Sequence, residues 1–159
     1  MSRLPVASRF SISRLLPQMK IALSNRQSGV KFPLRWLKSF ASRSLAECLD
    51  RLPGRGGPLR QLEEIEVAIV SDECIADVHR QFMDIEGPTD VITFDHGEIV
   101  ISADTAKANA AIYGKTLEEE LALYIIHGLL HLDGFTDKEP EAAAEMARLQ
   151  EEILKRCKT

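Results

Sequence analysis

Hydrophobic and polar positions change period several times along the chain, and each change predicts an element. Short runs of alternating or β-branched apolar residues predict four strands, at residues 19–24, 65–70, 89–94 and 98–101. The last two are separated by a tight Asp-His-Gly connection and form a hairpin. Apolar residues at three- and four-residue spacing predict five helices, at residues 33–52, 72–82, 103–113, 117–133 and from about residue 140 onward. This order predicts an α+β fold in which a small four-stranded mixed sheet packs with about five helices.

Capping signals support four of these helix boundaries. Ser102 stands where an N-cap is needed, and Gly114 follows the same helix as a glycine C-cap. Thr116 and Glu119 have the spacing of a capping box, which opens the next helix. Pro140 is suited to the first turn of the last helix.

The stretch from residue 124 to residue 137 carries the candidate chemistry. His127 and His131 stand four apart within an apolar run, so a helix places both imidazoles on one face. Gly134 is a plausible helix stop, after which the chain can turn back and bring Asp137 over the two rings. Two imidazoles and a carboxylate, with a fourth position open, have the composition of a catalytic zinc site.

Two alternatives remain beside this interpretation. Histidines four apart on a buried helix are often packed or hydrogen-bonded residues, and only the downstream Gly134 and Asp137 favour metal. Gly128 occupies the position at which metallopeptidase H-E-x-x-H motifs place a general-base glutamate, which disfavours a peptidase. His96, on the hairpin turn, competes with Asp137 as the third ligand.

Length, cysteine usage and hydropathy set the broad class. The chain of 159 residues suits one domain, which we place at residues 19–159. Residues 1–18 are acid-free and rich in Ser, Arg and Leu, and we expect them to be a poorly ordered extension or presequence. An upstream extension predicts a cytoplasmic protein, and a transit peptide predicts an organelle. No apolar run is long enough to cross a bilayer, and three scattered cysteines predict reduced thiols.

Charge is divided unevenly between the two parts of the chain. Residues 1–46 hold nine Lys or Arg and no acid, which leaves 11 bases against 24 acids in the remainder. A basic arm often contacts polyanions such as RNA, although it can equally serve to offset an acidic body. The sequence leaves both interpretations open.

The string H-x-x-x-H-x-x-G-x-x-D at residues 127–137 and two segments before it together resemble the YbeY family of bacterial metal-dependent endoribonucleases. Residues 127–137, H-G-L-L-H-L-D-G-F-T-D, are similar to the family signature H-G-x-L-H-L-x-G-Y-D-H. Residues 87–94, G-P-T-D-V-I-T-F, are similar to P-T-D-V-L-S-F, and residues 97–102, G-E-I-V-I-S, to G-D-I-V-I-S. The resemblance runs from Met19 to the C-terminus and implies a small sheet with helices packed on it and a metal cleft at the H-x-x-x-H helix.

The resemblance also implies a function. It implies a zinc-dependent, single-strand-specific endoribonuclease in ribosomal RNA maturation and ribosome quality control, with another divalent metal as the alternative to zinc. The implied partners are single-stranded RNA, rRNA and the ribosome or a ribosomal protein, with no membrane. The sequence does not predict an oligomeric state.

The chain departs from the family pattern at its chemically important positions. Asp137 stands in place of the third histidine, which makes the donor set harder and more anionic. Met83 stands where the family has an arginine thought to serve the substrate phosphate, and Arg80, one helical turn earlier, is the candidate substitute. Glu98 replaces a family aspartate and is a candidate for proton transfer or ligand orientation.

These departures leave other functions open. Arg80 is otherwise an ordinary exposed helix arginine, and Glu98 otherwise caps or pairs near the start of its strand. The loss of the third histidine and of the arginine leaves an enzyme with weakened activity as one alternative. A metal-dependent hydrolase of another substrate and a non-catalytic ribosome-associated binding protein are the others.

Overall fold

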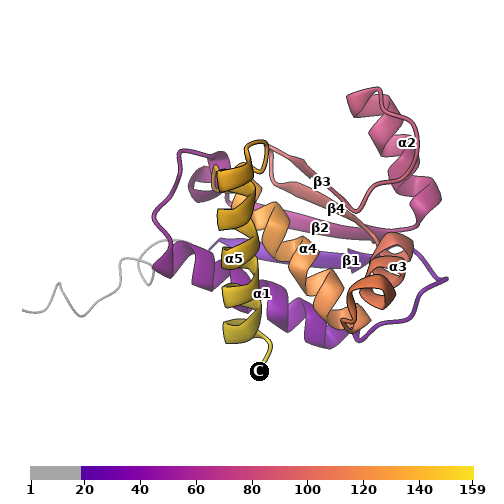
Figure 1. Cartoon of the computed structure of the whole chain (residues 1–159), viewed down its shortest axis with the longest axis horizontal. Helices are drawn as coiled ribbons and strands as arrows, with labels where there is room; N and C mark the ends of the chain where they lie inside the picture. Colours follow the sequence, from indigo (N-terminus) through magenta and orange to yellow (C-terminus); the bar gives the residue numbers. More distant parts are fainter. Residues whose placement is uncertain (1–18) are drawn as a thin grey trace, which may run out of the picture.

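A four-stranded mixed sheet forms the centre of the computed structural model, which describes residues 19–159 (Figure 1). Its strands are β1 (Lys20–Asn25), β2 (Glu64–Val70), β3 (Val91–Phe94) and β4 (Glu98–Ser102), in the spatial order β1-β2-β4-β3. β1 pairs with β2 and β2 with β4 in parallel, whereas β3 and β4 form the antiparallel hairpin. The predicted mixed sheet is confirmed.

The five predicted helices are also present. They are α1 (Leu34–Arg51), α2 (Asp72–Met83), α3 (Ala103–Tyr113), α4 (Leu117–Leu132) and α5 (Pro140–Cys157). Ser102 caps α3, and Thr116 and Glu119 form the capping box of α4, as the sequence predicts. α4 contacts α1, α3 and α5 as well as the sheet, whereas α2 projects away from this group (Figure 1).

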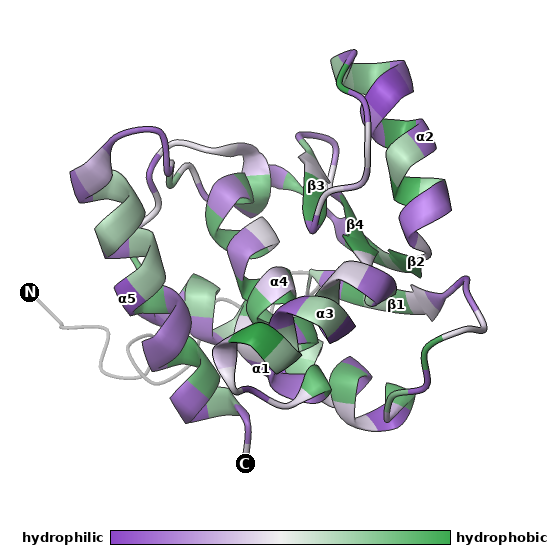
Figure 2. Cartoon of the chain, turned by 45° about the vertical axis from the view of Figure 1, so that its right-hand side comes forward, coloured by the Kyte–Doolittle hydropathy of each residue, from purple (hydrophilic) through white to green (hydrophobic). Residues whose placement is uncertain are grey.

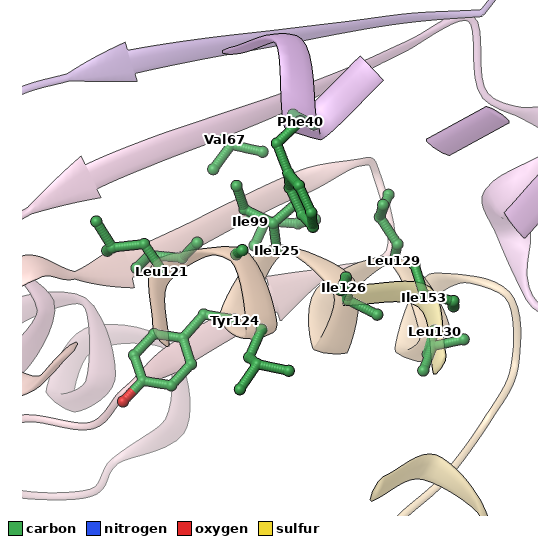
Figure 3. Close-up of a cluster of buried hydrophobic side chains, with 14 of the residues drawn as sticks. Phe40, Val67, Ile99, Leu121, Tyr124, Ile125, Ile126, Leu129, Leu130 and Ile153 are labelled. Carbon is green, nitrogen blue, oxygen red and sulfur yellow. The ribbon is translucent and has the colours of Figure 1, made fainter. Parts of the chain in front are cut away.

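Alternation along the strands separates two hydrophobic clusters. The larger lies between the sheet and the helices α1, α4 and α5, where Val67 and Ile99 pack near Phe40 and Ile125 (Figure 3). The smaller lies on the opposite face, where Ile75 of α2 packs with residues of β2, β3 and β4. The strands β2 and β4 are therefore strongly apolar, while α2 and α5 carry both polar and apolar residues (Figure 2).

Helix α4 is the most enclosed helix of the domain. Beyond its first turn, His127 and His131 are the residues of α4 that are not buried. An apolar surface on nearly all sides is what a helix needs at the centre of a core. Gly128 permits this position because a Cβ there would lie 2.8 Å from two carbon atoms of Ile99.

A few boundaries differ from the sequence predictions, each for a local reason. β3 begins at Val91 instead of residue 89, because the Asp90 carboxylate accepts the backbone N–H of Val91 at 2.7 Å. Part of the predicted loop at residues 54–58 belongs to a 3₁₀ helix, η2 (Pro58–Gln61), whose first residue is a proline.

Two further expectations concern the ends of the chain and membranes. The expectation of a poorly ordered extension or presequence concerns residues 1–18, which lie outside the described residues. Within residues 19–159, no helix has the length and apolar character that crossing a membrane requires.

Candidate metal centre

The last two turns of α4 bring two imidazoles together. The Nε2 atoms of His127 and His131 lie 2.9 Å apart, and their rings stand at 83° with centroids 4.4 Å apart. Both side chains are partly exposed on a helix that is otherwise buried. The four-residue spacing thus places both rings toward the same opening, because residues at i and i+4 share a helix face.

The chain reverses directly after α4 and adds a carboxylate. Gly134 adopts φ +100°, and a Cβ there would lie 2.5 Å from the carbonyl oxygen of Arg55. A glycine is needed on both counts. Phe135 then donates its N–H to the Leu130 carbonyl at 3.0 Å. The reversal places Asp137 Oδ2 3.6 Å from both histidine Nε2 atoms.

Both imidazoles have their second nitrogen engaged by an oxygen. His131 Nδ1 lies 3.1 Å from the Phe135 carbonyl oxygen, and His127 Nδ1 lies 2.6 Å from Gln150 Oε1 on α5. These oxygens accept, so each Nδ1 carries a proton and each Nε2 presents a lone pair. Two lone pairs that face one another at 2.9 Å repel unless a cation stands between them.

The three donor atoms therefore fit a divalent metal ion. The ligand atoms of His127, His131 and Asp137 all lie within 4.8 Å of one another. Two imidazole nitrogens and one carboxylate oxygen match the three protein ligands of catalytic zinc sites, and the oxygens behind the rings match the usual outer-shell partners.

Burial keeps the second imidazole in its ligand form. Desolvation lowers the pKa of His131, the charge of His127 lowers it further, and Asp137 opposes both effects. An imidazolium cannot bind a metal, so a lowered pKa favours the metal-binding form at neutral pH.

A cavity of about 400 Å³ opens from this group along α4. His127 and Asp137 line one end, α5 forms a wall, and the turn between α3 and α4 closes the other end. Burial raises the pKa of the Glu120 carboxyl in this cavity, while a hydrogen bond with Tyr124 and the charge of Lys115 lower it. The lining residues are Asp90, Tyr113, Lys115, Glu120, Leu123, Tyr124, His127, Asp137, Ala143, Met146, Ala147 and Gln150.

The structure places Arg80 and Met83 away from this group. Arg80 is exposed on α2, where its guanidinium pairs with Asp77 at 3.0 Å. Met83 is also exposed, at the end of the same helix. Neither residue lines the cavity that holds His127 and Asp137.

Glu98 and His96 also lie outside the cluster. The strand alternation turns Ile99 toward Gly128 of α4, so the neighbouring Glu98 faces the other side of the sheet. Glu98 lies opposite Glu66 in the strand register. His96 is exposed on the hairpin turn, where it stacks on Phe94 and lies 3.6 Å from Glu98.

Sequence reasoning missed Gln150 as an orienting partner of His127. Gln150 is 23 residues from His127, on a helix whose pattern predicts only an amphipathic surface. Nothing in its local sequence distinguishes it from other polar residues of α5. Asp133 was also missed, although an acid within the apolar run of residues 124–135 is an unusual feature.

Fold and site together define an α+β protein whose central helix carries a candidate His/His/carboxylate metal centre. The family model described as endoribonuclease YbeY matches residues 22–158, and the chain belongs to this family. The family is metal-dependent, and its members are hydrolases of the nuclease class. The resemblance seen in the three sequence segments is thereby confirmed.

Individual relatives agree with this assignment. The chain is 33% identical to endoribonuclease YbeY of Bacteroides thetaiotaomicron over 141 residues, 84% of this chain and 98% of the relative. It is 33% identical to the protein of the same name from Symbiobacterium thermophilum over 153 residues, 86% of this chain and 96% of the relative. The solution structure of TM1509 from Thermotoga maritima is similar with a TM-score of 0.56 and 25% identity, covering 86% of this chain and 87% of that one.

Proposed function

We propose that the protein is a zinc-dependent endoribonuclease that cleaves single-stranded ribosomal RNA during ribosome maturation and quality control. Membership of the endoribonuclease YbeY family supports the reaction class. The observation that carries the proposal is the convergence of His127, His131 and Asp137 at the end of a cavity, with both Nδ1 atoms held by oxygens.

The residues of the site divide into holding and orienting groups. His127, His131 and Asp137 would hold the ion, which supplies Lewis acidity toward a phosphoryl oxygen and lowers the pKa of water. Gln150 and the Phe135 carbonyl fix the rotation and the tautomer of the two rings. Asp137 is the most exposed of these three residues.

The donor set favours zinc over calcium or magnesium. Calcium and magnesium take oxygen ligands, whereas zinc binds imidazole nitrogen and carboxylate oxygen together. The carboxylate of Asp137 reduces the positive charge of the loaded site compared with a third imidazole. We therefore expect zinc to bind, with a substrate affinity that depends on cationic groups elsewhere in the cavity.

The proposed partners are single-stranded RNA, ribosomal RNA and the ribosome or one of its proteins. The proposed location is the cytoplasm. A peptidase is disfavoured because Gly128, the position of the metallopeptidase glutamate, packs directly against Ile99. A larger side chain there would have to displace the strand.

Metal content and RNA cleavage test the proposal together. We expect the purified protein to contain about one zinc ion per chain and to cleave a single-stranded oligoribonucleotide. His127→Ala should lose both properties, whereas His96→Ala, which removes an exposed histidine outside the group, should lose neither.

Other outcomes would point to other functions. A zinc-loaded protein that leaves single-stranded RNA intact between pH 6 and pH 9 would contradict the nuclease assignment. Co-sedimentation with ribosomes that survives mutation of both His127 and His131 would then indicate a binding protein. Hydrolysis of peptides or small esters without RNA cleavage would indicate another hydrolase.

A further inference from the structure

The end of the cavity opposite His127 and Asp137 carries a positively charged side chain. Among the lining residues, all within the described part of the chain, Lys115 is the single lysine or arginine. Asp90 and Glu120 line the same space with acidic groups. An anion that enters the cavity can therefore pair with Lys115 at this end, while Asp90 and Glu120 oppose it.

The backbone holds Lys115 in a fixed place. Gly114 closes α3 with φ +67°, and the Lys115 N–H donates to the Ala110 carbonyl at 3.0 Å. Directly afterwards, Thr116 caps α4 through a capping box with Glu119. Lys115 thus projects from a turn that is hydrogen-bonded on both sides, so its Cα is positioned relative to α4 and the metal group.

The present partner of Lys115 is exchangeable. Its Nζ lies 3.1 Å from Glu151 Oε1 on α5, and 52% of the Glu151 side chain is exposed. An ion pair with a largely exposed partner is weak because the carboxylate remains well hydrated. A phosphate oxygen can therefore compete for the same ammonium group.

An aromatic ring accompanies the cation. Tyr113 lines the same end of the cavity, and 68% of its surface is exposed. Exposed aromatic faces next to a cationic group are the parts from which single-strand binding sites are built, since bases stack on the ring while phosphates meet the charge.

The separation between Lys115 and the histidines suits a nucleotide next to the one whose phosphodiester bond is cleaved. Glu120, next to this end, is seven residues from His127 on α4, roughly 10 Å along the helix axis. We propose that Lys115 and Tyr113 form a subsite for a nucleotide flanking the cleaved phosphodiester, with Lys115 on a phosphate and Tyr113 on a base. This inference rests on the proposed nuclease function.

Salt dependence of binding tests the contact to phosphate. RNA affinity is measured by fluorescence anisotropy with a labelled single-stranded oligoribonucleotide and chelator-treated protein, so that no turnover occurs. Each phosphate contact to a single strand contributes about 0.7 to the slope of log K against log salt. Lys115→Met should therefore reduce that slope by about 0.7, so that its loss of affinity is roughly 2.5-fold greater at 50 mM than at 200 mM salt.

Matched variants separate the subsite from general charge. Lys107→Met removes an exposed lysine of α3 that does not line the cavity, and it should leave the slope unchanged. Lys115→Arg keeps the positive charge and should retain the wild-type salt slope. Glu151→Gln should strengthen RNA binding because it removes the carboxylate that competes with phosphate for Lys115. Tyr113→Ala should weaken binding by roughly fivefold or more, unlike Ile112→Ala beside it.

The outcomes are distinguishable from a failure of the nuclease assignment. Metal-loaded wild-type protein is assayed in parallel, and an absence of RNA cleavage there contradicts the proposed function. If wild type binds and cleaves RNA but Lys115→Met and Lys107→Met have equal salt slopes, the subsite is wrong. Equal losses of RNA affinity in Tyr113→Ala and Ile112→Ala would contradict the proposed stacking of a base on Tyr113.

Discussion

Arg60 and Asp133 form an ion pair that fastens the turn after α4 to the end of α1. Arg60 Nε lies 3.2 Å from Asp133 Oδ1, and the Asp133 side chain is 1% exposed. The same guanidinium donates to the carbonyls of Cys48 and Leu49 at 3.1 Å, in the last turn of α1. Asp133 precedes Gly134, so this pair supports the reversal that returns Asp137 to the histidines.

The two partners of this pair should differ in their effect on stability. Arg60→Met leaves a buried carboxylate without a partner and should lower the free energy of unfolding by about 3 kcal/mol. Asp133→Asn leaves a guanidinium that water can reach and keeps a polar side chain, so its cost should be smaller, about 1 kcal/mol. Urea unfolding of both variants measures this difference, and an Asp133→Asn loss equal to that of Arg60→Met would contradict it.

Gln150 should control metal affinity through the ring it orients. Gln150→Leu removes the acceptor for His127 Nδ1–H, and we expect zinc affinity to fall by about one to two orders of magnitude, the usual range of such outer-shell changes. Gln150→Glu keeps an acceptor and should retain affinity. Isothermal titration with zinc compares them, and Gln81→Leu on the exposed face of α2 is the control. Unchanged affinity in Gln150→Leu would remove this residue from the site.

Asp137 should determine both affinity and metal preference. Asp137→Ala removes the third ligand and should weaken zinc binding more than Gln150→Leu does, since a ligand is lost and not merely its support. Asp137→His places imidazole at the family position and should restore zinc binding. The visible absorption of the Co²⁺-loaded proteins reports the donor set directly, and identical spectra in wild type and Asp137→Ala would exclude the aspartate as a ligand.

The metal-free protein should lose stability as the pH falls. Burial lowers the pKa of His131 below its ordinary value of 6.5, so the unfolded chain binds more protons than the folded one between the two pKa values. Stability from this residue is therefore present above pH 6.5 and is lost as the pH falls toward the folded pKa. Urea unfolding of chelator-treated protein at several pH values measures the slope.

Variants test whether His131 causes this pH dependence of stability. His131→Asn should flatten the pH dependence between pH 7 and pH 5, because no ring then titrates at this position. His96→Asn, on the exposed hairpin turn, should leave the dependence as in wild type. An equal slope in wild type and His131→Asn would show that other groups set the acid sensitivity.

The three cysteines should differ sharply in reactivity. All are free thiols, and burial raises the pKa of Cys48 to about 12. Cys157 is also buried, and burial raises its pKa, whereas Cys74 is exposed on α2. Ellman's reagent should modify one thiol in the folded protein and three after unfolding. Cys74→Ser should abolish the rapid reaction, and modification of three thiols in the native protein would contradict the buried positions.

Local sequence determined the elements and the composition of the candidate centre. Helix signals such as Ser102 and the Thr116–Glu119 box act within one turn, so they are readable without a fold. The two histidines share a helix face at any i,i+4 spacing, and Gly134 marks the reversal toward Asp137. Each of these relationships spans fewer than twelve residues, within which backbone geometry decides position.

Tertiary structure alone decided which distant residues serve the site. Gln150 reaches His127 because α5 packs on α4, and Arg60 reaches Asp133 because η2 contacts α4. Glu98 lies elsewhere because strand alternation turns it from the cavity, and His96 lies on the exposed hairpin turn. Such placements depend on how apolar faces pack together. The residues next to a polar residue in the sequence do not determine that packing.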